Sequence, residues 1–345
     1  MVPRTAVVLF NLGGPESLET VEPFLFNLFN DRAILRLHQP LRWAVATLIA
    51  HRRAALALAI YRQIGGCSPL LAETEAQAKA LEDRLGGEAR VFVAMRYWHP
   101  MAAETAAAVA AFAPERLVLL PLYPQYSTTT TGSSLAAWKD AAGRVGLDVA
   151  AATICCYPDD DGLAAAHAAV IGEGLATAGD GARVLFSAHG LPERIVARGD
   201  PYVWQVERTV GAVRAALAAD GREPDWRVCY QSRVGPLRWV GPSTEAMISE
   251  AGRDRVPVVL SPIAFVSEHS ETLVELDIDY REKAERAGVP LYVRVPALGT
   301  HPRFIAALAE VVVRALARGP GAPCPAGGER LCPAGFAGCP AGCGG

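Results

Sequence analysis

Short apolar runs alternate with alanine-rich helical stretches along most of the chain. Four runs in the first half have the length and composition of buried strands: 7–10, 91–95, 117–123 and 149–156. Four runs in the second half share these properties: 184–188, 228–232, 256–265 and 291–298. Windows such as 73–85 and 301–318 have a helical pattern. Apolar strands that alternate with helices are typical of parallel sheets covered on both faces, so we predict an α/β fold.

The two halves of the chain repeat one order of motifs. VVLFNLGGPES and VLFSAHGLPER each read as a strand, a turn of small residues, and a proline followed by an acid. LVLLPLYPQYSTTTTGSS and PVVLSPIAFVSEHSETL each read as an apolar strand, a proline, an aromatic residue and a polar helix start. The repeat predicts two similar doubly wound domains, 1–178 and 179–318, that face a central cleft. Ligands of such folds bind at the carboxyl ends of strands, where the polar clusters of this sequence lie.

Composition narrows the class of protein. Hydrophobic residues make up 51% of the 345 residues and charged residues 20%, which is typical of a globular protein. The net charge is -3, and no basic run is interleaved with aromatic residues, so we expect no nucleic-acid partner. The N-terminus has the pattern of a first strand rather than of a signal peptide, and we therefore expect a cytoplasmic protein.

The apolar segment 40–61, PLRWAVATLIAHRRAALALAIY, leaves two interpretations open. His51, Arg52 and Arg53 interrupt it, so we expect it to be too short to span a membrane. It could form a helix pair packed in the core, or a partly exposed apolar lip that touches a membrane surface or an apolar ligand. The aromatic-rich segment 24–29 upstream favours the lip, which would allow peripheral contact with the inner face of the plasma membrane.

Two histidines follow predicted strands. His189 lies in a Gly/Pro turn, where neutral imidazole can accept a proton or bind a metal, although a turn histidine can also simply bond the backbone. His269 lies in FVSEHSETLVELDIDY with Glu268 and Glu271 beside it. Imidazole and carboxylates are ligands for divalent metals. The alternative is a solvated helix N-terminus, whose dipole acids would offset.

An acidic row extends beyond that helix start. Glu271, Glu275 and Asp279 are spaced by four residues, which would stack them on one face of an α-helix at a cost of a few tenths of a kcal/mol per pair. The helix dipole accounts for acids in the first turn but not for Glu275 or Asp279. We therefore expect the row to face a wet cleft that handles protons or cations.

Cations, aromatics and hydroxyls follow other predicted strands and helices. They include Arg52, Arg53, the RYWHP cluster at 96–100 and the YPQYSTTTTGSS segment at 123–134. Arginine pairs with carboxylates in two-pronged geometry, whereas the hydroxyls also suit helix capping. The sequence has no G-x-G-x-x-G pattern, Walker lysine or Ser-His-Asp signature. The set suits a flat, apolar, acid-bearing ligand and a metal better than it suits phosphate chemistry.

Residues 319–345 are rich in Gly, Pro and Cys and read as a tail. Its cysteines are Cys324, Cys332, Cys339 and Cys343, with the spacing C-x7-C-x6-C-x3-C. Disulfides are disfavoured in the cytosol, and zinc sites usually contain tighter pairs. An iron–sulfur cluster tolerates irregular spacing and is the favoured interpretation. Cys155 or Cys156 could replace one tail ligand, or could be simply buried.

Seven segments together resemble the ferrochelatase family, which inserts ferrous iron into a porphyrin to make haem. They are NLGGPES, YRQIGGCSP, RYWHP, YPQYSTTTTGSS, FSAHGLPERIVARGDPY, YQSRVGPLRWVGP and PIAFVSEHSETLVELDIDY. The resemblance covers about residues 5 to 318 and implies two Rossmann-like domains of the chelatase fold with the porphyrin between them. It places His189 over the porphyrin centre, with His269 and Glu271 facing it. We expect His189 to act on one face of the macrocycle and Glu271, paired with His269, on the other. It also implies a π-helical turn in the acidic segment.

The resemblance assigns further roles. His189, Glu271 and His269 would be catalytic, and His189, Glu271, Glu275 and Asp279 would handle metal and protons. Porphyrin contacts would come from Arg52, Arg53, Tyr61, Ser68, Arg96, Tyr97, Tyr123, Tyr230, Trp239 and Phe265. Some members carry a [2Fe–2S] cluster on three tail cysteines and one internal cysteine. The four tail cysteines of this chain leave the fourth ligand open.

The expected reaction is insertion of Fe²⁺ into protoporphyrin IX with release of two protons, the last step of haem biosynthesis. Fe²⁺ is then a substrate, and the cluster is the expected resident cofactor. Protoporphyrin is preferred over coproporphyrin III because the segment expected to form the lip is apolar. A cobalt or nickel chelatase and a non-catalytic haem or metal carrier on the same fold remain alternatives.

Overall fold

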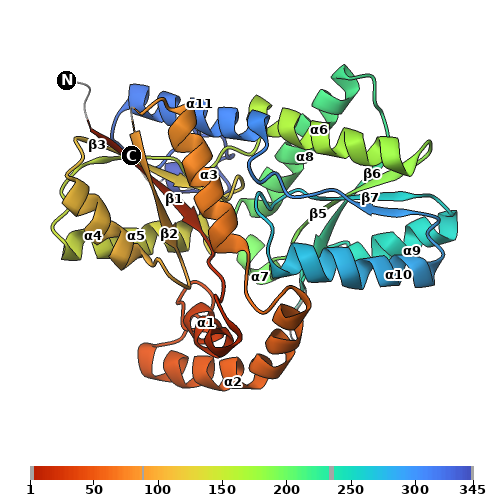
Figure 1. Cartoon of the computed structure of the whole chain (residues 1–345), viewed down its shortest axis with the longest axis horizontal. Helices are drawn as coiled ribbons and strands as arrows, with labels where there is room; N and C mark the ends of the chain where they lie inside the picture. The colour runs from red at the N-terminus through yellow and green to blue at the C-terminus, as the bar shows by residue number, and fades with distance from the viewer. Residues whose placement is uncertain (1–3, 88, 233–236, 343–345) are drawn as a thin grey trace.

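The computed structural model describes residues 4–87, 89–232 and 237–342, and two parallel sheets organise them (Figure 1). The first sheet has the order β2-β1-β3-β4 and the second has the order β6-β5-β7-β8. The strands of the first are β1 (Thr5–Asn11), β2 (Ala89–Met95), β3 (Arg116–Pro121) and β4 (Ala151–Thr153). Those of the second are β5 (Arg183–His189), β6 (Asp225–Gln231), β7 (Val258–Pro262) and β8 (Tyr292–Arg294). All eight predicted strands are present, and the predicted repeat is confirmed by the identical strand order.

Helices cover both faces of each sheet, as Figure 1 shows. Those after the first two are α3 (Leu70–Arg84), α4 (Ala102–Phe112), α5 (Thr131–Arg144), α6 (Asp161–Ala178), α7 (Glu193–Val196), α8 (Tyr202–Ala219), α9 (Thr244–Asp254), α10 (Tyr280–Ala287) and α11 (Pro302–Arg318). Side chains alternate across each strand, so Val8 and Phe10 of β1 pack toward α4 and α5, whereas Val7 and Leu9 pack on the opposite face. One apolar cluster on that opposite face continues beneath the second sheet and joins the two halves.

The two halves exchange covering helices. Helix α6 packs on the second sheet, where a Cβ on Gly174 would lie 2.5 Å from Val295 Cγ1 and 2.9 Å from Val259 Cγ1. Helix α11 crosses back and packs on α3 and α6. The predicted limits 1–178 and 179–318 therefore separate the two sheets, while the covering helices cross that division.

Helices α1 (Val21–Phe29) and α2 (Gln39–Gln63) form a separate lobe, entered through a short 3₁₀ turn, η1 (Leu18–Thr20), and drawn below the sheets in Figure 1. Helix α2 is one continuous helix rather than a helix pair. Its buried side chains are small except for Tyr61, and its exposed large apolar side chains are Leu41, Trp43, Leu48 and Leu56. The core interpretation was therefore wrong, and the segment forms an exposed apolar lip. We use that name for α1 and α2 from here on.

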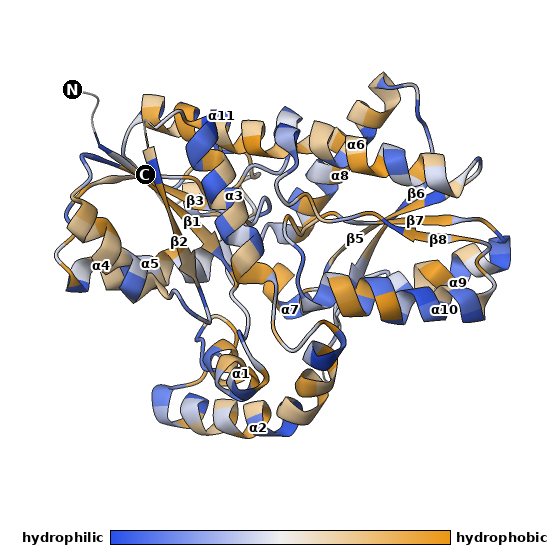
Figure 2. Cartoon of the chain, viewed as in Figure 1, coloured by the Kyte–Doolittle hydropathy of each residue, from blue (hydrophilic) through white to orange (hydrophobic). Residues whose placement is uncertain are grey.

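The length of α2 also corrects the expectation that this segment is too short to span a membrane. By length and composition alone, α2 could cross a membrane, and 17% of its most apolar stretch of 18 residues is buried in the protein. A core helix of a soluble protein can have the same length and composition, so this does not establish a membrane span. The interrupting cations Arg52 and Arg53 do not end the helix, because arginine has a high helix propensity. Figure 2 shows hydrophobic (orange) and hydrophilic (blue) residues mixed along α2, whereas strands β7 and β8 are mostly hydrophobic.

Candidate functional site

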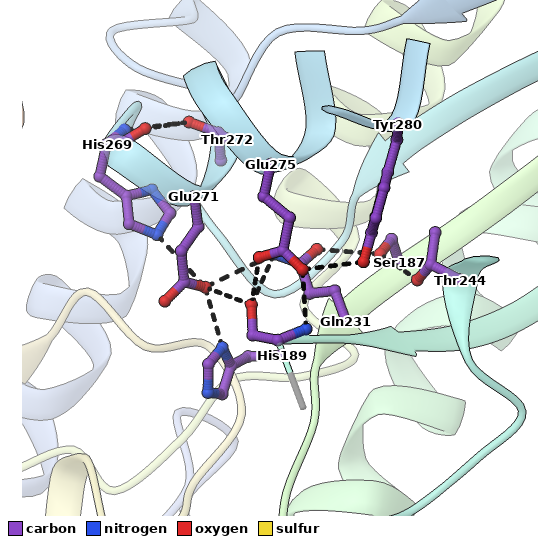
Figure 3. Close-up of polar contacts among 10 residues, drawn as sticks. Ser187, His189, Gln231, Thr244, His269, Glu271, Thr272, Glu275 and Tyr280 are labelled. Atoms are coloured by element: carbon purple, nitrogen blue, oxygen red, sulfur yellow. Dashed lines mark hydrogen bonds and ion pairs between the residues drawn. The ribbon is translucent and has the colours of Figure 1, made fainter. Parts of the chain in front are cut away.

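The polar site lies at the carboxyl edge of the second sheet (Figure 3). His189 is the last residue of β5, and Gln231 is the last residue of the neighbouring β6. The acidic segment follows β7 and forms a π-helix, η2 (Glu271–Asp279). Because β6, β5 and β7 are parallel neighbours, the segments that follow them meet at one edge.

One carboxylate oxygen is the centre of the site. Glu271 Oε2 lies 2.9 Å from His189 Nδ1, 3.2 Å from Ser232 Oγ and 3.4 Å from Gln231 Nε2. His269 Nε2 lies 4.0 Å from the same oxygen. The contact between His189 and Glu271 leaves no room for a flat ring between them. The expectation that they act from opposite faces of a porphyrin was therefore wrong, since both approach from one side.

Ser232 connects the two buried acids of the row. Its backbone N–H donates to Glu275 Oε1 at 2.9 Å, and its hydroxyl contacts both Glu271 Oε2 and Glu275 Oε2. The single hydroxyl proton can serve only one of these carboxylates at a time. Ser232 has φ +60°, a left-handed conformation that costs about 1–2 kcal/mol for a non-glycine residue. Sequence reasoning missed Gln231 and Ser232, although they are the last two residues of the predicted strand 228–232.

The π-helix divides the acidic row. Glu271 and Glu275 point to the same side in Figure 3, and Tyr280 OH donates to Glu275 Oε1 at 2.8 Å. Asp279 is exposed, so it continues the row at the surface rather than in the site. Asp277 faces elsewhere, as its carboxylate pairs with two arginines. The π-helical turn implied by the resemblance is confirmed.

The charges of the site are strongly coupled. Burial opposes protonation of His189, but the charges of Glu271 and Glu275 outweigh it and raise the pKa of the imidazole. Burial alone would raise the pKa of Glu271, yet His189, His269 and the Ser232 hydroxyl lower it to about 2. Burial and the Glu271 charge raise the pKa of Glu275. Glu271 therefore holds a negative charge while Glu275 is the easier carboxylate to protonate.

His269 and Phe265 complete the site. Burial lowers the pKa of His269, and its Nδ1 is a buried atom with no hydrogen-bond partner among the described residues. The Phe265 ring lies 4.5 Å from the His269 ring and 6.3 Å from the His189 ring, centroid to centroid. An apolar ring thus contacts both imidazoles, which gives this edge mixed apolar and basic character.

Two expected porphyrin contacts are already bound within the protein. Arg96 pairs with Asp31 at 3.0 Å and donates from Nε to Ser133 Oγ at 2.7 Å. Tyr97 is 1% exposed, and its hydroxyl donates to Asp31 Oδ2 at 2.7 Å. Asp31 follows α1, so these side chains anchor the lip to the first sheet. Sequence reasoning missed Asp31.

The other expected porphyrin contacts are spread around the lip and the sheet edges. Tyr61 and Tyr230 are buried, and Ser68 packs against Gly14, where a Cβ would lie 2.4 Å from Ser68 Oγ. Arg52 is exposed, and the Arg53 guanidinium lies 5.6 Å from the Phe29 ring. The Tyr123 hydroxyl is buried with no hydrogen-bond partner among the described residues. Trp239 forms an antiparallel bridge with Pro192.

The tail lies along β4 and brings cysteines together. Cys155 N donates to Cys324 O at 2.9 Å, and the Cys155 and Cys156 sulfurs lie 3.6 Å apart. The buried Gln205 side chain reaches both Cys156 Sγ at 3.4 Å and Cys332 Sγ at 3.1 Å. Near the chain end, a 3₁₀ turn, η3 (Pro340–Gly342), closes the described part of the tail.

These cysteines form a cluster of Cys155, Cys156, Cys324, Cys332 and Cys339, and all of them except Cys324 are buried. The neighbouring Cys155 and then burial raise the pKa of Cys156 far above its usual range. Burial and the nearby Cys339 raise that of Cys332 to about 12. No disulfide joins the described cysteines, and Cys343 lies outside the described residues. Within residues 4–87, 89–232 and 237–342, no three His, Cys, Asp or Glu side chains are arranged to hold a metal ion.

The two parallel sheets, with a histidine–carboxylate site at a strand edge, define a chelatase fold. SirB from Bacillus subtilis with Fe3+ superposes with a TM-score of 0.54 at 12% identity, over 92% of this chain and 96% of that one. The sirohydrochlorin chelatase SirB from Bacillus subtilis subspecies spizizenii in complex with cobalt gives 0.52 at 11% identity, over 90% and 95%. These likenesses show the fold alone.

Sequence comparison defines the family within that fold. The family model Ferrochelatase matches residues 4–316. The ferrochelatase of Caulobacter vibrioides (strain NA1000 / CB15N) is 53% identical over 99% of this chain and 98% of its own length. That of Phenylobacterium zucineum is 52% identical over 97% of both chains, and that of Pelagibacter ubique is 49% identical over 90% and 91%. The chain belongs to the ferrochelatase family, the enzymes that insert ferrous iron into a porphyrin to make haem.

Proposed function

We propose that this chain inserts Fe²⁺ into protoporphyrin IX and releases two protons, as the last step of haem biosynthesis. The observation that carries the proposal is the contact between His189 and Glu271 in a chain that is about half identical to ferrochelatases. Metal insertion must remove two pyrrole protons and bring a cation to the same four nitrogens. A basic imidazole beside an ionised carboxylate suits both tasks.

His189 and Glu271 divide the proton chemistry in this proposal. His189 accepts a pyrrole proton at Nε2, and Glu271 stabilises the resulting imidazolium through Nδ1–H. When the Nδ1 proton of the imidazolium passes to Glu271, the Ser232 hydroxyl takes that proton from Glu271 as it gives its own to Glu275, because it contacts both carboxylates. Asp279 continues the path at the surface. Hydrated Fe²⁺ can use the same row of oxygen ligands, and His269 lies close enough to Glu271 to share in its charge.

The lip supports the preference for protoporphyrin. Its exposed side chains Leu41, Trp43, Leu48 and Leu56 suit a macrocycle with apolar edges. Coproporphyrin III, which carries more carboxylates, is the alternative substrate. Anaerobic assays with Fe²⁺ and either porphyrin compare the two directly, and parallel assays with Co²⁺ and Ni²⁺ test the other chelatase activities.

The central assignment has a sharp test. His189→Ala should abolish insertion while porphyrin binding, followed by fluorescence quenching, stays near the wild-type value. Insertion at the wild-type rate by this variant would remove His189 from the mechanism. A wild-type protein that binds porphyrin without turnover would instead be a carrier.

We also propose that the cysteine cluster holds a [2Fe–2S] cluster. Cys332, Cys339 and Cys343 would supply the tail ligands. Cys156 is a better fourth ligand than Cys324, because one Gln205 amide spans the Cys156 and Cys332 sulfurs. Crowded buried thiols stay protonated without a cation, and a cluster would bind them as thiolates. Insertion needs no electron transfer, so the cluster would serve to hold the tail on β4 and α8.

We further propose a cytoplasmic protein whose lip touches the inner face of the plasma membrane. Exposed leucines and a tryptophan on α2, together with Arg52 and Arg53, suit an interface between lipid tails and anionic headgroups.

A further inference from the structure

The short connection between β7 and the π-helix carries Phe265 and His269 into the site, and a side chain of the other half holds it. Gln77 of α3 donates from Nε2 to Val266 O at 2.8 Å and to Gly299 O at 3.0 Å. Ser267 Oγ donates to Gln77 Oε1 at 2.9 Å. Gln77 is fully buried, and both of its amide hydrogens are used.

Helix α3 is itself fixed to the first sheet. Thr74, one turn before Gln77, accepts a hydrogen bond from Asn11 Nδ2 at 2.9 Å, and Asn11 is the last residue of β1. One turn of α3 therefore joins the end of β1 to the segment that precedes His269. The first half also carries the lip. Gln77 thus links the half that carries the lip, where the porphyrin is proposed to bind, to the half that carries Glu271 and Glu275.

The contacts of the second half do not depend on Gln77. Val266 O also accepts from Gly299 N at 2.9 Å, and His269 N donates to Thr272 Oγ1 at 2.9 Å. The contact between His189 and Glu271 likewise lies within the second half. Loss of the Gln77 amide would therefore leave the site assembled and change its placement relative to the first half.

We infer that Gln77 is a positioning residue for metal insertion. It sets the distance between the lip, where the porphyrin is proposed to bind, and the His269–Glu271 pair. The inference rests on the proposed roles of His269 and Glu271. Misplacement of reacting groups by about 1 Å can cost roughly 100-fold in rate, even when the change lies away from the chemistry. Seven of the ten expected porphyrin contacts lie in the first half, so porphyrin affinity depends less on this alignment than insertion does.

The test is Gln77→Met, which keeps the length of the side chain and removes its three hydrogen bonds. We expect kcat to fall by roughly 10- to 100-fold, while the porphyrin Kd changes by less than about twofold. The NMR titration of His189 should match the wild type, because its partners stay in place. Glu75→Gln, on the exposed face of α3, is the matched control and should keep the wild-type kcat.

Ser267→Ala is a milder variant that keeps the test useful if Gln77→Met folds poorly. It removes one of the three bonds and should lower kcat by a smaller factor, with no further loss when added to Gln77→Met. A wild-type kcat in folded Gln77→Met overturns the inference. So does a Gln77→Met variant that loses porphyrin affinity and whose His189 no longer titrates as in the wild type. A wild-type enzyme without insertion activity would instead refute the proposed function.

Discussion

Replacement of Glu271 by glutamine tests the electrostatic core of the site. Glu271→Gln keeps the shape of the side chain and leaves an oxygen that can accept from His189 Nδ1, but it removes the charge. Burial is the largest single influence on His189 and lowers its pKa, but the charge and hydrogen bond of Glu271, together with the charge of Glu275, outweigh it. Without the Glu271 charge, burial prevails, and we expect the imidazole to titrate below its ordinary value.

The distance sets the size of the effect. Two unit charges 2.9 Å apart interact by about 6 kcal/mol at an effective dielectric constant of about 20, and by about 1.4 kcal/mol in bulk water. About a third of each side chain is exposed, so solvent screening favours the lower part of this range. A value of about 2 kcal/mol corresponds to a fall of about 1.5 pKa units for His189.

Two measurements follow this change. NMR titration of ¹⁵N-histidine-labelled protein gives the pKa directly, with the resonance assigned by its loss in His189→Ala. A general base must be neutral, so the wild-type rate should rise as the pH passes the pKa of His189. In Glu271→Gln that rising limb should move to lower pH, and the maximal rate should fall by roughly 100-fold.

The matched control is Glu275→Gln. Glu275 contributes less to the His189 pKa than Glu271 does, and burial together with the Glu271 charge raises its own pKa. We expect this variant to move the His189 pKa by less than about 0.5 unit. A His189 pKa that stays within about 0.3 unit of the wild-type value in Glu271→Gln would refute the electrostatic reasoning.

Three further predictions concern the cysteine cluster, the core and the lip. Anaerobically purified protein should absorb visible light; Cys332→Ser should remove this absorbance and Cys324→Ser should keep it, whereas a colourless wild type contradicts the cluster. Gly174→Ala should destabilise the protein by about 1–3 kcal/mol, because its Cβ would clash with valines of the second sheet. Gly211→Ala, in open space on α8, should instead stabilise it by about 0.5–1 kcal/mol in chemical unfolding. Leu48→Gln should weaken sedimentation with anionic liposomes, and unchanged binding would argue against a lipid-facing lip.

Sequence reasoning located the strands and most of the candidate site, because these depend on local patterns. Buried parallel strands are continuous apolar runs, and the side chains just after them must lie at one sheet edge. His189, His269, Glu271 and Glu275 could therefore be named from their places after strands. Asp279 was assigned to the same row from α-helical spacing, and it lies where the row reaches the surface.

Contacts between distant segments could not be read in this way. Asp31 and Arg96 meet across the lip, and Gln205 bridges Cys156 and Cys332, although no periodic pattern relates these positions. The exposure of α2 was also undecided, since an alanine- and leucine-rich helix has the same composition in a core or on a surface.

The sequence by itself determined the α/β class, the repeat of two similar halves, the family and the kinds of chemistry at the strand ends. These follow from local hydrophobic patterns and short motifs. The tertiary structure decided that His189 and Glu271 are in contact, that Ser232 joins two acids, and that Gln77 links the halves. Each of these depends on distances between segments far apart in the chain, which only the packing of both halves fixes.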